Sequence, residues 1–386
     1  MNITRRNFTI GTAALALSAC SGADNSAPFA ARGDGDLPSD LLPQPNAGYD
    51  AWVASFKSRA GGQGISPGIL NQAFATTGYL PGVVKRDRNQ TEFSRSLEDY
   101  LAIAASDERV TKGRAAFARH RNTLAQIEGR YGVPAEVVTA VWGLESFYGE
   151  RRGNVPVISA TSTLAYDGRR GEFFEKQLVA ALKILERGDV SVSGLTGSWA
   201  GAMGHTQFIP TSYQAFAVDF NGDGKRDIWS EDPTDSLAST AAYLAKSGWK
   251  SGQKWGGEVG TAAAGSAAPV SILQPDAGGP RFAVFNNFSA IKRYNNSDNY
   301  AIGVGHLSDR IAGGGPIQAQ FGPDKYGMTI DDRKALQQRL TARGFDTDGT
   351  DGVIGPNSRK AISAYQQSRG MAVTGDPSIE LLASLG

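Results

Sequence analysis

The sequence is poor in cysteine and histidine and has no excess of either charge. Cys20 is the only cysteine among 386 residues, so no disulfide can form within the chain. The three histidines, His120, His205 and His306, are far apart, and there is no HExxH motif or Cys/His cluster, which argues against a zinc site. Lys and Arg number 39 against 38 Asp and Glu. This balance excludes binding to nucleic acid through bulk charge, and we expect no nucleic-acid partner.

Long apolar runs are also missing beyond the N-terminus, where no run reaches the ~18–20 residues that a membrane-spanning helix requires. Residues 1–20 have the composition of a signal peptide, with two arginines followed by an apolar stretch. Arg5-Arg6, followed by Asn-Phe, resembles a twin-arginine export signal. We therefore expect the mature protein in the periplasm.

The last four residues of this segment, Leu17-Ser18-Ala19-Cys20, resemble a bacterial lipobox. The resemblance implies cleavage before Cys20 and a lipid anchor on its thiol, which would make a membrane surface a partner. The alternative is an ordinary signal peptide ending near Ala19. Ser21 stands where some lipoproteins carry the aspartate that retains them at the inner membrane, so the outer membrane is favoured.

Composition divides the rest of the chain into two folded parts. The helical period dominates from Tyr49 onwards, short strands are expected at Val270–Leu273 and Arg281–Phe285, and a helix is expected near Asn299–Ile311. The fold class is therefore mainly α, with a small β-containing section. The predicted limits are a signal peptide at 1–20, a Pro/Gly/Ser-rich tether at 21–46, a large domain at 47–312, a linker at 313–326 and a small domain at 327–386.

The stretch Val141–Glu150 (VWGLESFYGE) places a glutamate in an apolar run. With Pro134 at the first position of a helix, Val138, Val141, Trp142 and Gly149 share one face, and Glu145 lies at its centre. A carboxylate on an apolar face is costly unless it is paired or keeps its proton. One interpretation is a structural glutamate paired with an arginine. The other is a general acid whose pKa is raised by burial.

Two downstream segments carry further polar candidates. Residues 197–210 (GSWAGAMGHTQFIP) combine small residues, which allow close backbone approach, with Ser198, Thr206 and Gln207, which could orient a sugar or the Glu145 carboxyl. A tightly packed helix junction is the alternative.

The second segment is Asp219–Asp227 (DFNGDGKRD), where Asp219, Asn221 and Asp223 alternate and Gly224 is sixth, as at the start of an EF-hand calcium loop. Ser230 stands at the twelfth position, where that motif has Glu, so Asp232 or Asp235 is expected to close the site. A polar turn without a metal is the alternative.

Together with Arg293–Ser297 (RYNNS), these motifs resemble the lytic murein transglycosylase B family, glycoside hydrolase family 103, over about residues 48–312. The resemblance implies a lysozyme-like, mainly helical domain that acts on peptidoglycan glycan strands. It implies that Glu145 is the single catalytic acid, that Ser198, Gln207, Tyr294 and Asn295 bind substrate, and that Asp219, Asn221, Asp223 and Asp235 hold a structural calcium ion. No cofactor is expected for the chemistry itself.

The implied reaction is lytic cleavage of the β-1,4 bond between N-acetylmuramic acid (MurNAc) and N-acetylglucosamine (GlcNAc), which leaves 1,6-anhydro-MurNAc ends. One carboxylate suffices because the sugar supplies its own nucleophile, whereas ordinary glycosidases use two. A muramidase-type hydrolase and a non-catalytic wall-binding lipoprotein are the alternatives.

The C-terminal segment resembles a peptidoglycan-binding-like module of three short helices. Leu336, Leu340, Ile362 and Tyr365 fall at helical spacing and are expected in its core. A folding appendage without affinity for sugars is the alternative.

Overall fold

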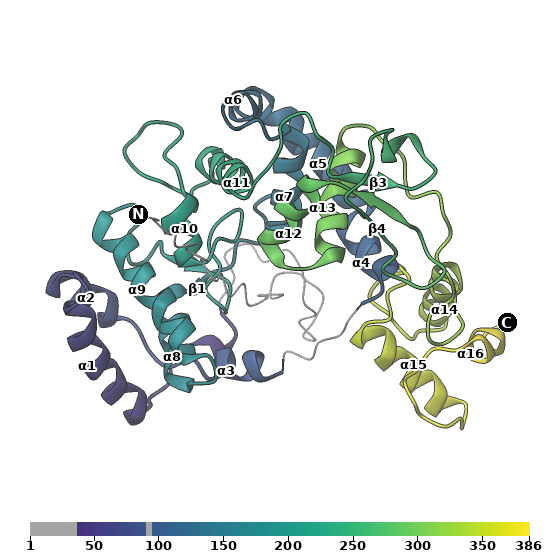
Figure 1. Ribbon diagram of the computed structural model, residues 1–386. Coiled ribbons are helices and arrows are strands. Elements are labelled where there is room, and N and C mark those ends of the chain that lie inside the picture. Colours follow the sequence, from purple (N-terminus) through teal and green to yellow (C-terminus); the bar gives the residue numbers. More distant parts are fainter. Residues whose placement is uncertain (1–36, 90–94) are drawn as a thin grey trace, which may run out of the picture.

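The computed structural model describes residues 37–89 and 95–386. Cys20, the predicted signal peptide and most of the predicted tether lie outside these residues. The described chain is mainly helical, as expected, with two small antiparallel sheets (Figure 1). None of its helices combines the length and the apolar character needed to cross a membrane.

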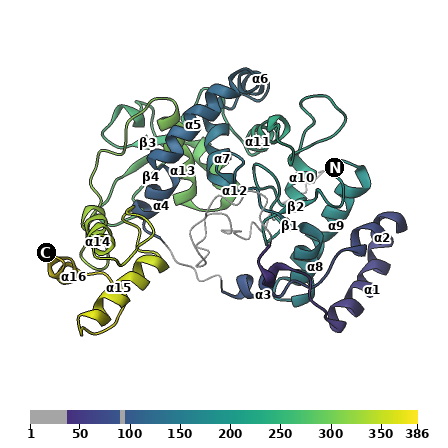
Figure 2. The ribbon, with the colours of Figure 1, turned by 180° about the vertical axis from the view of Figure 1, so that it is seen from behind.

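One end of the molecule is built from the first helices packed on a later pair (Figures 1 and 2). Ser66 begins α2 (Pro67–Ala75), because its side chain accepts the Ile69 N–H. Phe56 and Leu182 lie in the shared core. The elements are η1 (Ser39–Leu41), α1 (Ala47–Gly61), α2 (Pro67–Ala75), α3 (Pro81–Arg88), α8 (Val157–Asp167) and α9 (Gly171–Arg187).

The centre of the molecule is a second helical group in which α7 and α13 lie side by side (Figures 1 and 2). Ten of the twelve residues of α7 are buried, so this is a core helix rather than a surface helix. The elements are α4 (Leu97–Ala104), α5 (Asp107–Arg119), α6 (Arg121–Tyr131), α7 (Ala135–Ser146), α11 (Thr234–Lys246), α12 (Asn286–Asn295) and α13 (Asp298–Ile311). Helix α10 (Pro210–Phe216) packs mainly on α9 and connects the two groups through α11.

The start of α7 differs by one residue from the prediction. Pro134 has an extended ψ of 139° and precedes the helix instead of opening it. This follows from its role as the last extended residue after Gly132, whose φ of 68° ends α6 in the left-handed region.

The short strands form a three-stranded sheet beside the central helices. Its order is β3-β5-β4, with β5 (Phe282–Val284) between β3 (Gly256–Glu258) and β4 (Ser271–Leu273). The two strands expected from the sequence are confirmed, although β4 begins one residue later than expected and β5 is one residue shorter at each end. The sequence analysis missed β3 because its Gly-Gly-Glu composition lacks strand propensity. The other sheet pairs β1 (Val155–Pro156) with β2 (Thr196–Gly197), and a 3-10 turn, η2 (Ala262–Ala264), follows β3.

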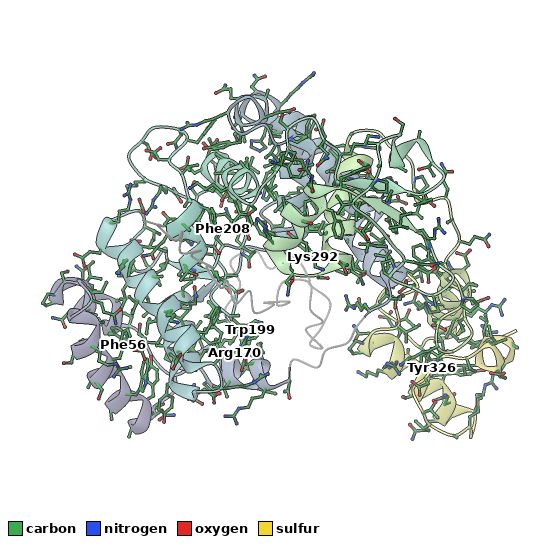
Figure 3. All side chains as sticks on the ribbon, in the orientation of Figure 1. Phe56, Arg170, Trp199, Phe208, Lys292 and Tyr326 are labelled. Carbon is green, nitrogen blue, oxygen red and sulfur yellow. The ribbon has the colours of Figure 1, made fainter. Side chains whose placement is uncertain are left out.

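The C-terminal segment has three helices, α14 (Ile330–Ala342), α15 (Pro356–Ser368) and α16 (Ile379–Ser384), at the end of the molecule opposite α1 and α2 (Figure 1). The four residues predicted for its core, Leu336, Leu340, Ile362 and Tyr365, are all buried. Tyr326, labelled in Figure 3, donates a hydrogen bond to Asp376 at 2.8 Å. Arg333 of α14 is 2% exposed and joins Glu98 and Asp99 of α4 at 2.7 and 2.9 Å.

Candidate active site

Glu145 lies in the last turn of α7 and is only 8% exposed. Val138, Val141 and Trp142 are buried on the same helix, as predicted. Gly149 does not extend that face, because α7 ends at Ser146. Within its own helix, Glu145 therefore has apolar neighbours on the N-terminal side.

The chain changes direction immediately after Glu145. Phe147, Tyr148 and Gly149 have φ angles of 53°, 60° and 90°, all in the left-handed region. Such a conformation costs free energy for residues other than glycine, and it is kept only where the surroundings enforce it. The end of α7 is therefore a fixed feature whose geometry determines where the Glu145 side chain lies.

The Glu145 carboxyl meets a phenol from a distant helix. The hydroxyl of Tyr300, in the first turn of α13, donates a hydrogen bond to Glu145 Oε1 at 2.6 Å. The rings of Tyr294 and Tyr300 are stacked with centroids 6.3 Å apart. Burial, followed by the charge of Glu145, raises the pKa of both phenols well above the usual value, so both keep their protons.

The sequence analysis missed Tyr300. The residue is 155 positions from Glu145 in the sequence, and nothing in its local pattern separates it from a core tyrosine. The only local signal is that it follows Ser297, whose side chain accepts the Tyr300 N–H and begins α13.

Residues 197–208 fold into a compact loop held by two isolated bridges, Gly197 to Met203 and Met203 to Phe208. Ser198 accepts the Ala202 N–H at 3.1 Å. Gln207 has a φ of 51°, and its amide nitrogen donates to the carbonyls of Arg152 at 2.9 Å and Gly204 at 2.8 Å.

Two contacts connect this loop with Tyr294. The Tyr294 hydroxyl donates to the Thr206 carbonyl at 2.6 Å, next to Gln207. Phe208, labelled in Figure 3 with Lys292 of α12, packs on Tyr294 at 5.9 Å between centroids. The structure thus brings the Gln207 segment, Tyr294 and the Tyr300–Glu145 pair into one region, although the three segments are far apart in the sequence.

Two polar atoms of this region are buried without a hydrogen-bond partner among the described residues. They are Oδ1 of Asn295, which follows Tyr294, and Oγ1 of Thr206. Buried polar atoms are nearly always paired, so each of these two unpaired oxygens needs an explanation. A ligand that brings a hydroxyl or amide donor to either oxygen would satisfy it.

The predicted calcium loop brings its acidic side chains together, and of the two residues expected to complete the site it is Asp235 that does so. Carboxylate oxygens of Asp219, Asp223 and Asp235 lie within 4.8 Å of one another. The amide of Asn221 lies 3.4 Å from Asp223 Oδ2. Asp232 instead accepts the Thr234 N–H at 3.0 Å, before α11. A cluster of oxygen donors fits a hard cation such as Ca²⁺.

Asp235 is held in place by the loop itself. It accepts backbone N–H groups from Phe220 at 2.8 Å, Asn221 at 3.3 Å and Asp227 at 2.9 Å. Burial raises the pKa of the Asp235 carboxyl against the lowering effect of these three N–H groups, and the nearby Asp219 raises it further. A bound cation would offset both the cost of burying the ionised Asp235 carboxyl and its repulsion with Asp219.

Comparison with known proteins gives the family. The chain matches the transglycosylase SLT domain family in two segments, 48–271 and 260–309, and a putative peptidoglycan binding domain family over residues 329–385. The chain belongs to the transglycosylase SLT family. Glu145, Tyr300 and the 197–208 loop all fall within the segments that match this family.

Relatives of known name agree with this assignment. The chain is 33% identical over 211 residues to membrane-bound lytic murein transglycosylase B of Escherichia coli strain K12, a match that covers 47% of this chain and 58% of that relative. The matched stretch therefore spans less than two thirds of the relative's length.

Among solved structures, SltB3 of Pseudomonas aeruginosa, determined in complex with NAG-anhNAM-pentapeptide, is 43% identical and has a TM-score of 0.69. This match covers 88% of our chain and all of SltB3. Escherichia coli Slt35, determined in complex with calcium, is 26% identical with a TM-score of 0.59, over 70% of our chain and 95% of Slt35. The expected lysozyme-like, mainly helical fold of these transglycosylases is thereby confirmed.

Proposed function

We propose that the protein is a peptidoglycan lytic transglycosylase that cleaves the β-1,4 bond between MurNAc and GlcNAc and leaves 1,6-anhydro-MurNAc ends. The observation that carries the proposal is the buried Glu145, which receives a 2.6 Å hydrogen bond from Tyr300, whose pKa burial raises well above its usual value. Membership of the transglycosylase SLT family supports the same activity.

The first step is proton donation to the bridging oxygen of the glycan. Burial disfavours the ionised carboxylate and therefore favours the protonated acid that this step needs. In the proposal Oε2 of Glu145 carries the transferable proton, while Oε1 accepts the bond from Tyr300. Positive charge then develops at C1 of the muramyl sugar as the bond to GlcNAc breaks.

In the second step, the ionised Glu145 takes the proton from the C6 hydroxyl of the same sugar, and the C6 oxygen closes on C1. The Tyr300 hydrogen bond stabilises the carboxylate between the two steps, and bonds to charged groups contribute about 1.5–3 kcal/mol. A nucleophile within the same molecule has an effective concentration of ~10⁵ M or more when it is well oriented, so an activated water is unnecessary.

Four further side chains are proposed to bind the glycan strand: Ser198, Gln207, Tyr294 and Asn295. The unpaired Oδ1 of Asn295 supports its role as an acceptor for a sugar hydroxyl or the N–H of an acetamido group. Gln207 and Tyr294 meet at Thr206, so they would contribute to one side of the same binding region.

The loop of Asp219, Asn221, Asp223 and Asp235 is proposed to hold a calcium ion. The ion would have a structural role, because Ca²⁺ supplies charge neutralisation for these carboxylates and no redox chemistry. The clustered carboxylate oxygens support the proposal, and Slt35 of the same fold was crystallised in complex with calcium.

The remaining assignments concern the location and layout of the protein. We propose a catalytic domain at 47–312 and a peptidoglycan-binding module at 327–386, joined by a linker at 313–326. A lipid on Cys20 would anchor the periplasmic protein to a membrane, with the outer membrane favoured, after export by the twin-arginine route. Membrane-bound lytic murein transglycosylase B of E. coli, a relative, is membrane-bound by name.

Mass spectrometry of the ends released from purified sacculi tests the proposed activity. Anhydro-MurNAc ends are one water molecule lighter than hydrolytic ends. We expect anhydro ends from the purified protein. Hydrolytic ends would indicate a muramidase, and binding to sacculi without any released ends would indicate a wall-binding protein.

A further inference from the structure

His205 lies in the 197–208 loop and is 3% exposed. Its ring Nδ1 accepts a hydrogen bond from Trp142 Nε1 at 3.1 Å, and its carbonyl oxygen accepts the Ser146 hydroxyl. Trp142 and Ser146 belong to the last turns of α7, one before and one after Glu145. His205 therefore contacts the helix on both sides of the candidate acid.

The other side of the ring is tied to a different segment. Nε2 of His205 lies 2.7 Å from the Ser230 carbonyl oxygen, and the His205 N–H donates to the Ile228 carbonyl at 3.1 Å. Because Nδ1 accepts the indole N–H, the ring proton is on Nε2, which donates to Ser230. Arg152 donates to the same carbonyl at 3.0 Å.

The ring stays neutral over the working range of pH. Burial, together with the positive charge of Arg152, lowers the pKa of His205 to about 4. The acceptor at Nδ1, which only the neutral ring offers, is therefore present throughout the pH range of a periplasmic enzyme.

The turn that follows α7 is packed closely against the His205 ring. A Cβ atom on Gly149 would come within 2.6 Å of the His205 ring, so the left-handed turn that follows Glu145 rests directly on this side chain. Replacement of the ring would therefore remove packing at the point where the chain leaves α7.

We propose that His205 is a positioning residue for Glu145. It holds the last turn of α7 against the 228–230 segment through Trp142, Ser146 and Gly149, and it thereby fixes the Glu145 carboxyl beneath the Tyr300 hydroxyl. This inference rests on the proposed function, since it assigns the purpose of the position to that reaction. In this proposal His205 acts through the helix and needs no contact with the reacting atoms or the sugars.

Three substitutions distinguish the contributions of the two hydrogen bonds that the His205 ring makes, one at Nδ1 and one at Nε2. His205→Asn keeps an acceptor at the place of Nδ1, facing Trp142. His205→Gln keeps a donor at the place of Nε2, facing Ser230. His205→Ala removes both. A fourth change, Trp142→Phe, removes the indole N–H from the other partner while it retains an aromatic ring.

A positioning role predicts a specific kinetic pattern on sacculi. We expect His205→Ala to lower kcat by about tenfold or more, equivalent to about 1.4 kcal/mol, with KM changed by less than about twofold. His205→Asn should recover most of kcat, because it retains the bond that faces α7. His205→Gln should not recover kcat, because it lacks that bond. Trp142→Phe should lower kcat in the same way as His205→Ala.

His306 provides the matched control, since it is also buried and burial also lowers its pKa to about 4. His306→Asn should lower the melting temperature and leave kcat within about twofold of the unsubstituted protein.

The inference is overturned if the His205 and His306 variants lose similar stability and all retain kcat. If His205→Ala does not fold, equal kcat in His205→Asn and His205→Gln overturns it. Failure of the proposed function is distinguishable, because the unsubstituted protein would then release no anhydro ends.

Discussion

Glu145 and Asp235 are two buried carboxyl groups in the same domain, with different partners and different proposed roles. Glu145 is 8% exposed and Asp235 is 1% exposed, so burial alone does not separate them. Glu145 meets the hydroxyl of Tyr300 among aromatic rings, whereas Asp235 accepts three backbone N–H groups of its own loop. The comparison teaches that burial alone does not tell which chemistry an acid supports, because the groups around two buried carboxyls can differ completely.

The amide donors around Asp235 favour its ionised form and fix its oxygens in space, which suits a ligand for a cation. Glu145 instead lies beside the stacked rings of Tyr294 and Tyr300 and accepts one hydroxyl donor, which would stabilise its carboxylate once the proton has been transferred. The two regions are also connected. Asp227 Oδ1 accepts the Ser230 N–H at 3.1 Å, and the Ser230 carbonyl faces His205 beside α7.

A third buried carboxyl, Asp309, sharpens the comparison. Burial raises its pKa to about 6, and Trp255 Nε1 donates to it at 3.1 Å. By titration alone it would be the candidate general acid. It lies nine residues beyond Tyr300 on α13, roughly 13 Å along the helix axis, and we expect Asp309→Asn to retain activity.

The largest effect predicted for Asp309→Asn is on stability as a function of pH. The folded pKa of about 6 lies above the usual 3.8, so the stabilisation is complete below about pH 4 and is lost as pH rises through 6. Asparagine has no such loss. Relative to the unsubstituted protein, the variant should gain about 3 kcal/mol between pH 4 and neutral pH in urea unfolding. A difference that is constant with pH would contradict this assignment.

Tyr300→Phe should give the next largest effect. The substitution keeps the stacked ring and removes only the hydrogen bond to Glu145. Loss of a bond to a group that becomes charged costs about 1.5–3 kcal/mol, so kcat should fall by about tenfold to a hundredfold. Steady-state digestion of sacculi measures this. A change confined to KM would show that Tyr300 binds substrate and does not assist the acid. Tyr326→Phe, at the end of the linker and packed against the core of the C-terminal module, is the control.

Asp235→Asn should give the smallest effect of the three. If the loop binds calcium, the free energy of unfolding rises by about 1.4 kcal/mol when the free ion is at ten times its Kd. Thermal melts with and without CaCl₂ should show this rise in the unsubstituted protein, and the variant should lose it. Asp232→Asn is the matched control, because Asp232 bonds Thr234 and lies outside the cluster. Equal calcium shifts in all three proteins would contradict the assigned site.

Short-range patterns in the sequence predicted much of this structure. The apolar face around Glu145 and the core of the C-terminal helices follow from helical spacing, and their burial is confirmed. The alternating oxygen-bearing residues Asp219, Asn221 and Asp223 predicted the loop. Only the structure shows that Asp235, and not Asp232, lies in the cluster. That difference depends on where α11 begins.

Contacts between distant segments could not be predicted. The helix expected near Asn299–Ile311 was found, but α12, which carries Tyr294 and Asn295, was not assigned in advance. Tyr300 reaches Glu145 only because α13 packs on α7. The role of His205 likewise depends on three segments that meet in space, which no periodicity in a single segment reveals.

The most direct test of the central claim is the rate at which Glu145→Gln releases anhydro-MurNAc ends from sacculi. Glutamine is nearly isosteric and can still accept the Tyr300 hydrogen bond, but it cannot donate and recover the proton. We expect a fold that melts cooperatively near the temperature of the unsubstituted protein, with a rate lower by about a thousandfold or more, equivalent to about 4 kcal/mol. A variant that releases anhydro ends at a near-normal rate would contradict the account.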